Sequence, residues 1–437
     1  MKVLSTLSCF FIFISIQAQQ IWSLEDCIDY ALNNNISLKQ SELNIELNKN
    51  EYFQSKMELL PSVNISNSFN NNRGRYINPF TNEFDEEVTS SLNLSYNSSL
   101  SLFNGFKNIN QIKKAANESL KSIYDLESAQ NDLISSIALS YLQILFNEEL
   151  YKTSESQLDL TKNQENRIKT LVELGSIAQG ELLNIQSQLA SEEQQLIQAE
   201  NQLNLSKLQL AQLLELNQYE NLNVLKLDIK VPIFKIKNNI NTDYSIALNT
   251  QSSIKSSELE INSAIYDHKI ARANYLPSLS IGHRISTLYL DNLDDIFTFN
   301  EQLENNQQSA IFLSLNIPIF NKWNIRNSVA QSKIQIENSQ LNAQQAKNQL
   351  RKNMEQAYAD QLAAYKKYQA TQKAVIAFKE AFNYINERYE IGMVNSYEFN
   401  ESKNKLITAE SDELRAKYDL IFKVKLYEFY TSLKFEL

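Results

Sequence analysis

The scarcity of glycine and proline constrains this chain more than any other feature. The 437 residues include only 6 Gly and 5 Pro, and the stretch from Ile319 to Ile391 contains neither. Because these two residues supply most turn geometry, so few of them predict long, uninterrupted elements. The mean hydropathy of -0.38 indicates that most surfaces of these elements face water. A compact enzyme core is therefore not the first expectation.

The N-terminus has the layout of a secretory signal. An apolar run from Val3 to Ile16 follows a basic residue and precedes small and polar ones. The run is shorter than the roughly 20 apolar residues of a membrane-spanning helix, so we expect residues 1–20 to be a signal peptide rather than an anchor. Cys9 lies within it. Cys27 would then be the only cysteine of the exported chain, which excludes an intrachain disulfide.

Composition also disfavours several classes of function. The net charge of -10 and the pI of about 5.1 argue against nucleic-acid binding, which normally needs a basic face. His268 and His283 are the only histidines, so a histidine-based metal site or a Ser/His/Asp triad is not expected. The sequence has no P-loop or other nucleotide motif. We therefore expect neither an enzyme nor a required cofactor.

Four landmarks recur along the chain at a nearly constant spacing. Ala31-Leu32-Asn33 recurs as Ala247-Leu248-Asn249, and Leu60-Pro61-Ser62 recurs as Leu276-Pro277-Ser278 at the same spacing. Phe103-Asn104 recurs as Phe320-Asn321, and Leu174-Gly175 as Ile391-Gly392, both with the spacing longer by a single position. Such a pattern indicates an internal duplication. We predict a first repeat at residues 21–216, an inter-repeat segment at 217–241 and a second repeat at 242–437.

Each repeat begins with a predicted helix and two predicted strands. The helices are Ser23–Glu58 and Thr242–Asn274, each followed by a proline that restricts the residue before it to extended geometry. The strands, in which apolar and polar residues alternate, are 61–72 and 88–104 in the first repeat and 277–290 and 307–320 in the second. Polar loops, Asn70–Glu87 and Leu288–Asn306, join the two strands of each repeat.

A long helical hairpin completes each repeat. Helices of about 70 residues run from Gly105 to Leu174 and from Trp323 to Ile391, and each would be on the order of 100 Å long. The chain turns at tips 174–178 and 391–395 and returns as Ser176–Leu216 and Asn395–Leu433. A compact globular domain of this size would not contain helices of such length.

The strands have the length of membrane-spanning β-strands. Runs of roughly 10 residues span a membrane when tilted, although a small water-facing sheet on a coiled-coil protein is the alternative. Aromatic residues at the strand ends would form an interfacial girdle: Phe103, Phe106, Phe320 and Trp323. Four strands cannot close a barrel, and two open edges in lipid would cost on the order of tens of kcal/mol. Other copies must therefore close it, and three would give 12 strands with the polar residues inward, although the sequence does not determine the number.

In this arrangement the chain resembles the TolC family of outer-membrane efflux and secretion channels. The resemblance covers essentially all of the mature sequence and rests on the duplication, the Leu-Pro-Ser strand starts, the corners at residues 101–106 and 317–321, and Arg388-Tyr389-Glu390-Ile391-Gly392. It implies a mainly α fold: a homotrimer whose β-barrel, four strands per protomer, crosses the outer membrane and continues as an α-helical barrel through the periplasm. It also implies a mixed equatorial region that includes the inter-repeat segment.

Two acids follow the second tip glycine and allow two interpretations. In the structural one, Asn395 or Ser396 caps the returning helix, Asn395 having Glu398 at capping-box spacing, and Glu401 pairs with Lys405. Ser176 with Gln179 repeats this arrangement after Gly175. In the functional one, Glu398 and Glu401 share a helix face and form stacked carboxylate rings in a trimer. Two such charges 6 Å apart would repel by about 3 kcal/mol, which favours bound cations and a cation-sensitive constriction.

The resemblance assigns further roles at the tips. It supports the constriction at Glu398 and Glu401, and it places Tyr389 and Glu181 in the latch that holds the tip closed. The basic member of that latch falls on Val394, which carries no charge, so Arg388 or Lys403 would have to substitute. The turns resemble the motif that receives the hairpin of a periplasmic adaptor, with the contact residues Leu174, Gly175, Ser176, Ile391, Gly392 and Met393.

The sequence therefore predicts a passive outer-membrane exit duct of a tripartite efflux or type I secretion system. Its partners would be two further copies, outer-membrane lipid, a periplasmic adaptor protein and an inner-membrane pump that supplies the energy. The alternative is an exported coiled-coil structural or adhesive protein whose sheets never enter lipid. The generic polar residues expected in the lumen do not identify the cargo.

Overall fold

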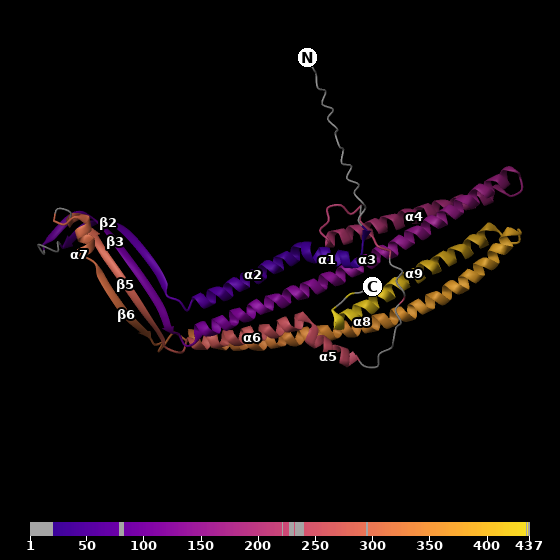
Figure 1. Cartoon of the computed structure of the whole chain (residues 1–437). Helices are drawn as coiled ribbons and strands as arrows, with labels where there is room; N and C mark the ends of the chain where they lie inside the picture. The colour runs from indigo at the N-terminus through magenta and orange to yellow at the C-terminus, as the bar shows by residue number, and fades with distance from the viewer. Residues whose placement is uncertain are drawn as a thin grey trace, which may run out of the picture. The chain divides into compact units, whose positions relative to one another are not determined.

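The computed structural model describes residues 21–77, 83–220, 222–226, 231, 240–293, 296–433 and 435 (Figure 1). The predicted signal peptide lies outside the described residues. The chain divides into two units, which are described separately. The sheet unit consists of residues 41–125 and 252–347, and the hairpin unit of the described residues among 1–40, 126–251 and 348–437.

Four antiparallel strands make the sheet of the sheet unit, in the order β2-β3-β5-β6 (Figure 1). The strands are β2 (Ser62–Ile77), β3 (Phe84–Phe103), β5 (Ser278–Leu290) and β6 (Gln308–Asn316). Each repeat supplies two of them, and the two central strands come from different repeats. On their outer sides β2 and β6 pair with no other strand of the described chain.

The pleat gives this sheet one apolar and one polar face. Cross-strand partners on the apolar face include Ile65, Tyr96 and Ile285, and those on the polar face include Asn64, Asn97 and Arg284. The apolar face is open, with Ile65 80% and Ile311 75% exposed. The predicted alternation of apolar and polar residues is confirmed. A single chain leaves this apolar surface in contact with solvent, so it needs another environment to cover it.

The strands of the first repeat are longer than the predicted segments 61–72 and 88–104. β2 continues to Ile77 and β3 begins at Phe84, so most of the expected loop from Asn70 to Glu87 is strand. The extension escaped prediction because residues 70–75 include no apolar side chain on either face, so the apolar alternation that predicted the strands is interrupted there. The backbone nevertheless stays in register along the whole pair.

In the second repeat the predicted strand 307–320 is shorter than expected. β6 ends at Asn316, shortly before Pro318, which has no N–H to donate to a ladder. The expected loop from Leu288 to Asn306 contains the short helix α7 (Phe299–Asn305). The Gln302 side chain of α7 bonds both the N–H and the C=O of Leu290, at 2.9 and 3.1 Å, where β5 extends past β6. This helix therefore covers a strand edge that β6 leaves open.

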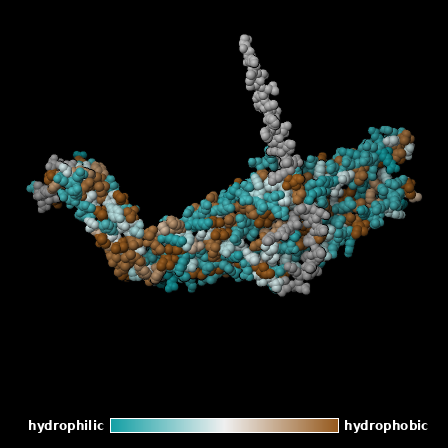
Figure 2. Space-filling view, viewed as in Figure 1, coloured by the Kyte–Doolittle hydropathy of each residue, from teal (hydrophilic) through white to brown (hydrophobic). Residues whose placement is uncertain are grey.

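The corners between strands and helices present exposed aromatic side chains. Gly105 has a φ of 67°, and a Cβ there would lie 2.5 Å from the carbonyl oxygen of Ala273, so glycine is required at this turn. The predicted girdle residues are all exposed: Phe103, Phe106, Phe320 and Trp323. Figure 2 shows hydrophobic residues gathered where the sheet meets the helices of this unit.

The hairpin unit is built from two long helical hairpins. The first pairs α3 (Lys107–Glu173) with α4 (Gln179–Leu213), and the second pairs α8 (Asn324–Glu390) with α9 (Ser396–Ser432). The initial segments of α3 and α8 belong to the sheet unit. Both α3 and α8 have 67 residues, near the predicted length. None of the described helices has the length and apolar character needed to cross a membrane.

The main core of the hairpin unit surrounds Tyr141 on α3. This side chain is fully buried, and its hydroxyl donates to the carbonyl oxygens of Trp22 at 3.2 Å and Leu225 at 2.8 Å. Trp22 and Leu225 lie at the short parallel pair of β1 (Ile21–Trp22) and β4 (Asn223–Val224). One tyrosine thus joins the start of the first repeat to the inter-repeat segment, which lies only partly within the described residues.

The predicted helices Ser23–Glu58 and Thr242–Asn274 are each broken in two. The observed pairs are α1 (Leu24–Asn34) with α2 (Ile36–Met57), and α5 (Ile240–Thr250) with α6 (Ser252–Ala273). At the first break Asn35 is extended, and its side chain accepts from the N–H of Ser37 at 3.0 Å and Leu38 at 3.3 Å. Asn35 therefore ends one helix and caps the next. In the second repeat Gln251 separates α5 from α6 at the equivalent position.

Candidate functional site

Both hairpins turn through a glycine in the left-handed conformation. Gly175 and Gly392 have φ of 70° and 76°. At each turn the glycine N–H bonds a carbonyl three residues back, and the next N–H bonds a carbonyl five residues back, the pattern of a Schellman motif. A Cβ on either glycine would meet nothing within 4 Å. These positions therefore require glycine for backbone geometry alone.

The tips expose apolar side chains to solvent. Leu174, Ile391 and Met393 are 72%, 68% and 67% exposed, and Ser176 is exposed as well. All six residues predicted to contact an adaptor lie at these two turns. Surfaces of this kind suit a partner that covers them.

The two returning helices begin differently. In α9 the Asn395 side chain accepts from the Glu398 N–H at 3.0 Å, as the spacing predicts, but the Glu398 side chain returns no bond to the Asn395 N–H, so only half of the capping box forms. In α4 the N-cap is Ala178, which makes no side-chain cap. The cap predicted for Ser176 is wrong, because this residue lies within the turn and uses its own N–H to close it.

Glu398 and Glu401 lie in the first turns of α9 with exposed side chains. The Glu398 side chain makes no hydrogen bond or ion pair with any described residue, whereas Glu401 accepts from Lys405 at 2.6 Å. Both members of that pair are about half exposed, so it contributes only about 0.2–1 kcal/mol. The arrangement suits the start of a helix and leaves both carboxylates accessible.

Tyr389 and Glu181 meet through a third residue, Ser396. The Ser396 hydroxyl donates to the Glu181 carboxylate and lies 3.5 Å from the Tyr389 hydroxyl. The Tyr389 ring stacks on Phe399 with centroids 4.5 Å apart. Ser396 thus bridges the two hairpins. The sequence offered Ser396 only as a possible cap, because its partner Glu181 lies in the other repeat.

The position expected to hold the basic member of the latch is apolar and buried. Val394 is 9% exposed and lines a cavity of about 410 Å³ whose lining is mixed, with apolar Ile168 and Leu171 beside charged Arg167 and Glu181. Neither suggested substitute takes its place. Arg388 lies over the ring of Tyr384, and Lys403 pairs elsewhere.

Lys403 makes a buried ion pair between the hairpins. Its Nζ lies 3.3 Å from Glu192 Oε1 and donates to the Thr161 hydroxyl at 2.7 Å. Thr161 in turn donates to Glu192 at 2.5 Å. The two charged side chains are 5% and 3% exposed. Burial lowers the pKa of Lys403, and the Glu192 carboxylate opposes part of that shift. The sequence analysis missed this cluster, because nothing local distinguishes Glu192 from the exposed acids around it.

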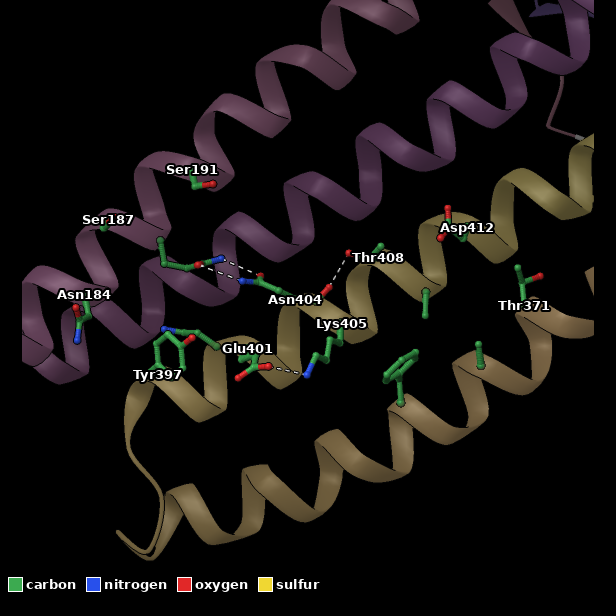
Figure 3. A pocket seen from close by; sticks show the side chains of 15 residues that line it. Asn184, Ser187, Ser191, Thr371, Tyr397, Glu401, Asn404, Lys405, Thr408 and Asp412 are labelled. Carbon is green, nitrogen blue, oxygen red and sulfur yellow. Dashed lines mark hydrogen bonds and ion pairs between the residues drawn. The ribbon is translucent and has the colours of Figure 1, made fainter. Parts of the chain in front are cut away.

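A groove lies between α4, α8 and α9, and Glu401 and Lys405 are among the residues that line it (Figure 3). It has a volume of about 750 Å³, and Gln188 of α4 bonds Asn404 of α9 across it at 3.1 Å. Its lining is dominated by Ser, Thr, Asn and charged residues. Over the described ranges, no cluster of His, Cys, Asp or Glu could hold a metal ion.

Sequence comparison places most of the chain within one family model. The model described as outer membrane efflux protein matches residues 27–215 and 244–423. A relative, the toxin and drug export protein A of Aggregatibacter actinomycetemcomitans, is 25% identical over 352 residues, which are 76% of this chain and 70% of the relative.

Solved structures share the fold at lower identity. The CmeC outer membrane channel of Campylobacter jejuni has a TM-score of 0.78 and 19% identity, covering 93% of this chain and 85% of that one. A membrane protein from Pseudomonas aeruginosa has a TM-score of 0.79 and 16% identity, covering 96% of this chain and 93% of that one. At these identities the likeness establishes the fold.

Proposed function

The chain belongs to the outer membrane efflux protein family, and from this premise we propose that it is the exit duct of a tripartite efflux or type I secretion system. It is an outer membrane efflux channel component. The family consists of transport ducts rather than enzymes, so we expect passive conduction driven by a partner pump. The relative named above exports toxins and drugs, which makes organic molecules and secreted polypeptides the cargo classes to test first.

The observation that carries this proposal is the sheet, which has an open apolar face and strands at both edges without an outer partner among the described residues. In lipid each unpaired backbone group costs several kcal/mol, so only closure with further copies makes such a sheet stable there. Three copies give a barrel of 12 strands with the Ser and Asn residues inward. The helical hairpins would then extend into the periplasm.

The tips form the proposed gate and docking point. Glu398 and Glu401 would supply rings of carboxylates at a periplasmic constriction, and Tyr389 with Glu181 would hold the tips through Ser396. The exposed Leu174, Ile391 and Met393 support docking of a helical adaptor hairpin, because apolar side chains at a turn can enter grooves between helices.

Channel formation is tested with the purified full chain in detergent and in planar bilayers. We expect a trimer that dissociates only on heating in SDS and discrete conductance steps in bilayers. A stable monomer that remains soluble without detergent would refute the channel and favour a structural or adhesive protein.

The gate is tested in the same bilayers with hexamminecobalt added from the periplasmic side. Replacing Glu398 and Glu401 by Gln should weaken block by this trivalent cation. Glu428→Gln serves as the matched control, because it removes an exposed carboxylate from the same helix at the end remote from the tip. Unchanged block in the double variant would exclude these carboxylates from the constriction.

A further inference from the structure

Arg284 is an exception on the polar face of the sheet. It lies in the middle of β5, opposite Asn97 of β3, and its side chain is exposed. Serine and asparagine dominate the polar face around it. We propose that Arg284 and Phe312 form a binding site for aromatic organic anions on this face. The proposal rests on the proposed function, in which the polar face lines the lumen and the site occurs once per protomer.

The guanidinium group of Arg284 is held in place but retains donors for a ligand. Its Nε–H donates to Asn97 Oδ1 at 2.8 Å, and the Asn97 amide donates to the Ser95 hydroxyl at 3.3 Å. Arginine has five N–H donors, so four remain after this bond. Within the described part of the chain Arg284 makes no ion pair. A planar, oriented cation with free donors suits a carboxylate or a sulfonate.

The neighbouring hydroxyl groups are already engaged with one another. Ser62 and Ser99 lie 2.9 Å apart across β2 and β3, and Ser66 and Ser95 lie 2.6 Å apart. Each pair uses one O–H donor internally and carries no charge. Beside these pairs, Arg284 is the group that can bind an anion by charge as well as by hydrogen bonds.

Phe312 supplies an aromatic surface beside that cation. It pairs with Gly282 in the register of β5 and β6, and a Cβ at Gly282 would lie 2.3 Å from the Phe312 ring. The ring therefore covers the glycine, on the same face as Arg284, and is still 44% exposed. Gly282 and Arg284 are two residues apart on one strand, roughly 7 Å.

This pairing selects for ligands with two parts. An acidic group would accept from the guanidinium while an aromatic ring stacks on Phe312, an interaction that adds to simple area burial. Inorganic anions would use only the charge. A lipid-facing role is not expected, because His283 and Ile285, which flank Arg284 in β5, lie on the opposite, apolar face.

The test measures conductance of the reconstituted full-length channel against salt concentration in sodium 1-naphthalenesulfonate and, for comparison, sodium methanesulfonate. For the wild type we expect saturation in the aromatic salt at lower concentration than in methanesulfonate. Arg284→Gln should raise the half-saturating concentration of 1-naphthalenesulfonate about tenfold, since a hydrogen bond to a charged group contributes about that factor. Phe312→Ala should raise the half-saturating concentration of 1-naphthalenesulfonate and leave that of methanesulfonate unchanged.

His283→Gln is the matched control, because it changes the adjacent residue on the opposite face and should leave both curves unchanged. On SDS gels each variant must migrate as a trimer that dissociates only on heating. If Arg284→Gln does not assemble, Arg284→Lys and Phe312→Ala still decide the question, since lysine keeps the charge but not the planar donors. The inference is overturned if the curves of conductance against 1-naphthalenesulfonate concentration are equal in three proteins: the wild type, Phe312→Ala and the Arg284 variant that assembles. A wild type without any conductance refutes the proposed function instead.

Discussion

Removal of the positive charge of Lys403 provides the sharpest test of how the two hairpins are held together. Lys403→Met keeps much of the side-chain volume but leaves the Glu192 carboxylate, only 3% exposed, without its ion partner. Breaking a buried pair from one side typically costs about 3–5 kcal/mol. Two neutral donors remain, Thr161 at 2.5 Å and Gln188 at 2.8 Å. We therefore expect the lower end of that range, about 3 kcal/mol.

Hydrogen exchange followed by mass spectrometry on the folded trimer measures this cost locally. If amides of α9 near residue 403 exchange through separation of the hairpins, about 3 kcal/mol corresponds to roughly a hundredfold loss of protection. Lys405→Met is the matched control. Its exposed pair with Glu401 contributes at most about 1 kcal/mol, or roughly a fivefold change.

The double variant Lys403→Met with Glu192→Leu separates a buried charge from lost packing. Replacing both members of a buried pair by apolar residues is often neutral or stabilising, so protection should return toward the wild-type level. The reasoning is refuted if Lys403→Met exchanges like the wild type. It is also refuted if the double variant is as unprotected as the single one.

Three further predictions follow from single residues. Gly392→Ala should destabilise the tip by about 1–2 kcal/mol through its positive φ alone. Gly180→Ala, at the second position of α4 and equally free of close neighbours, should not destabilise and should stabilise by at most about 0.5–1 kcal/mol; chemical denaturation compares the two variants. Cys27 is fully buried and its thiol pKa is raised to about 12, so maleimide should label it only upon unfolding, and labelling of the native trimer would contradict the structure. Burial lowers the pKa of Lys403 from 10.5, so just below pH 10.5 the unfolded chain binds more protons than the folded chain. The free energy of unfolding should therefore rise with pH in this range, and Lys403→Met should abolish this part of the rise.

Local signals predicted most of the secondary structure. Alternation along Ile65 and its neighbours indicated strands, and the absence of Gly and Pro indicated the two longest helices. The errors arose where a local signal was weak or ambiguous. The polar ends of β2 and β3 lack alternation, and Asn35 breaks a helix at a position where asparagine can also be tolerated within one.

In the candidate site, too, contacts within a few residues could be predicted and contacts between the two repeats could not. Asn395 caps α9 through a contact with Glu398 in the first turn, and spacing alone predicts it. The bridge from Ser396 to Glu181 and the pair of Lys403 with Glu192 each join one repeat to the other. The family resemblance left Arg388 or Lys403 as the basic member of a latch, yet Lys403 pairs with buried Glu192 and Arg388 lies over the ring of Tyr384.

The sequence by itself determined the repeated order of helices and strands, the two glycine turns and the polarity of each sheet face, because each depends on neighbours a few positions away. Only the tertiary structure decided which charge became buried and which ring came to lie beside Arg284. Within a regular helix or strand, successive polar residues share the same backbone geometry. The partner of each one therefore depends on the element that packs against it.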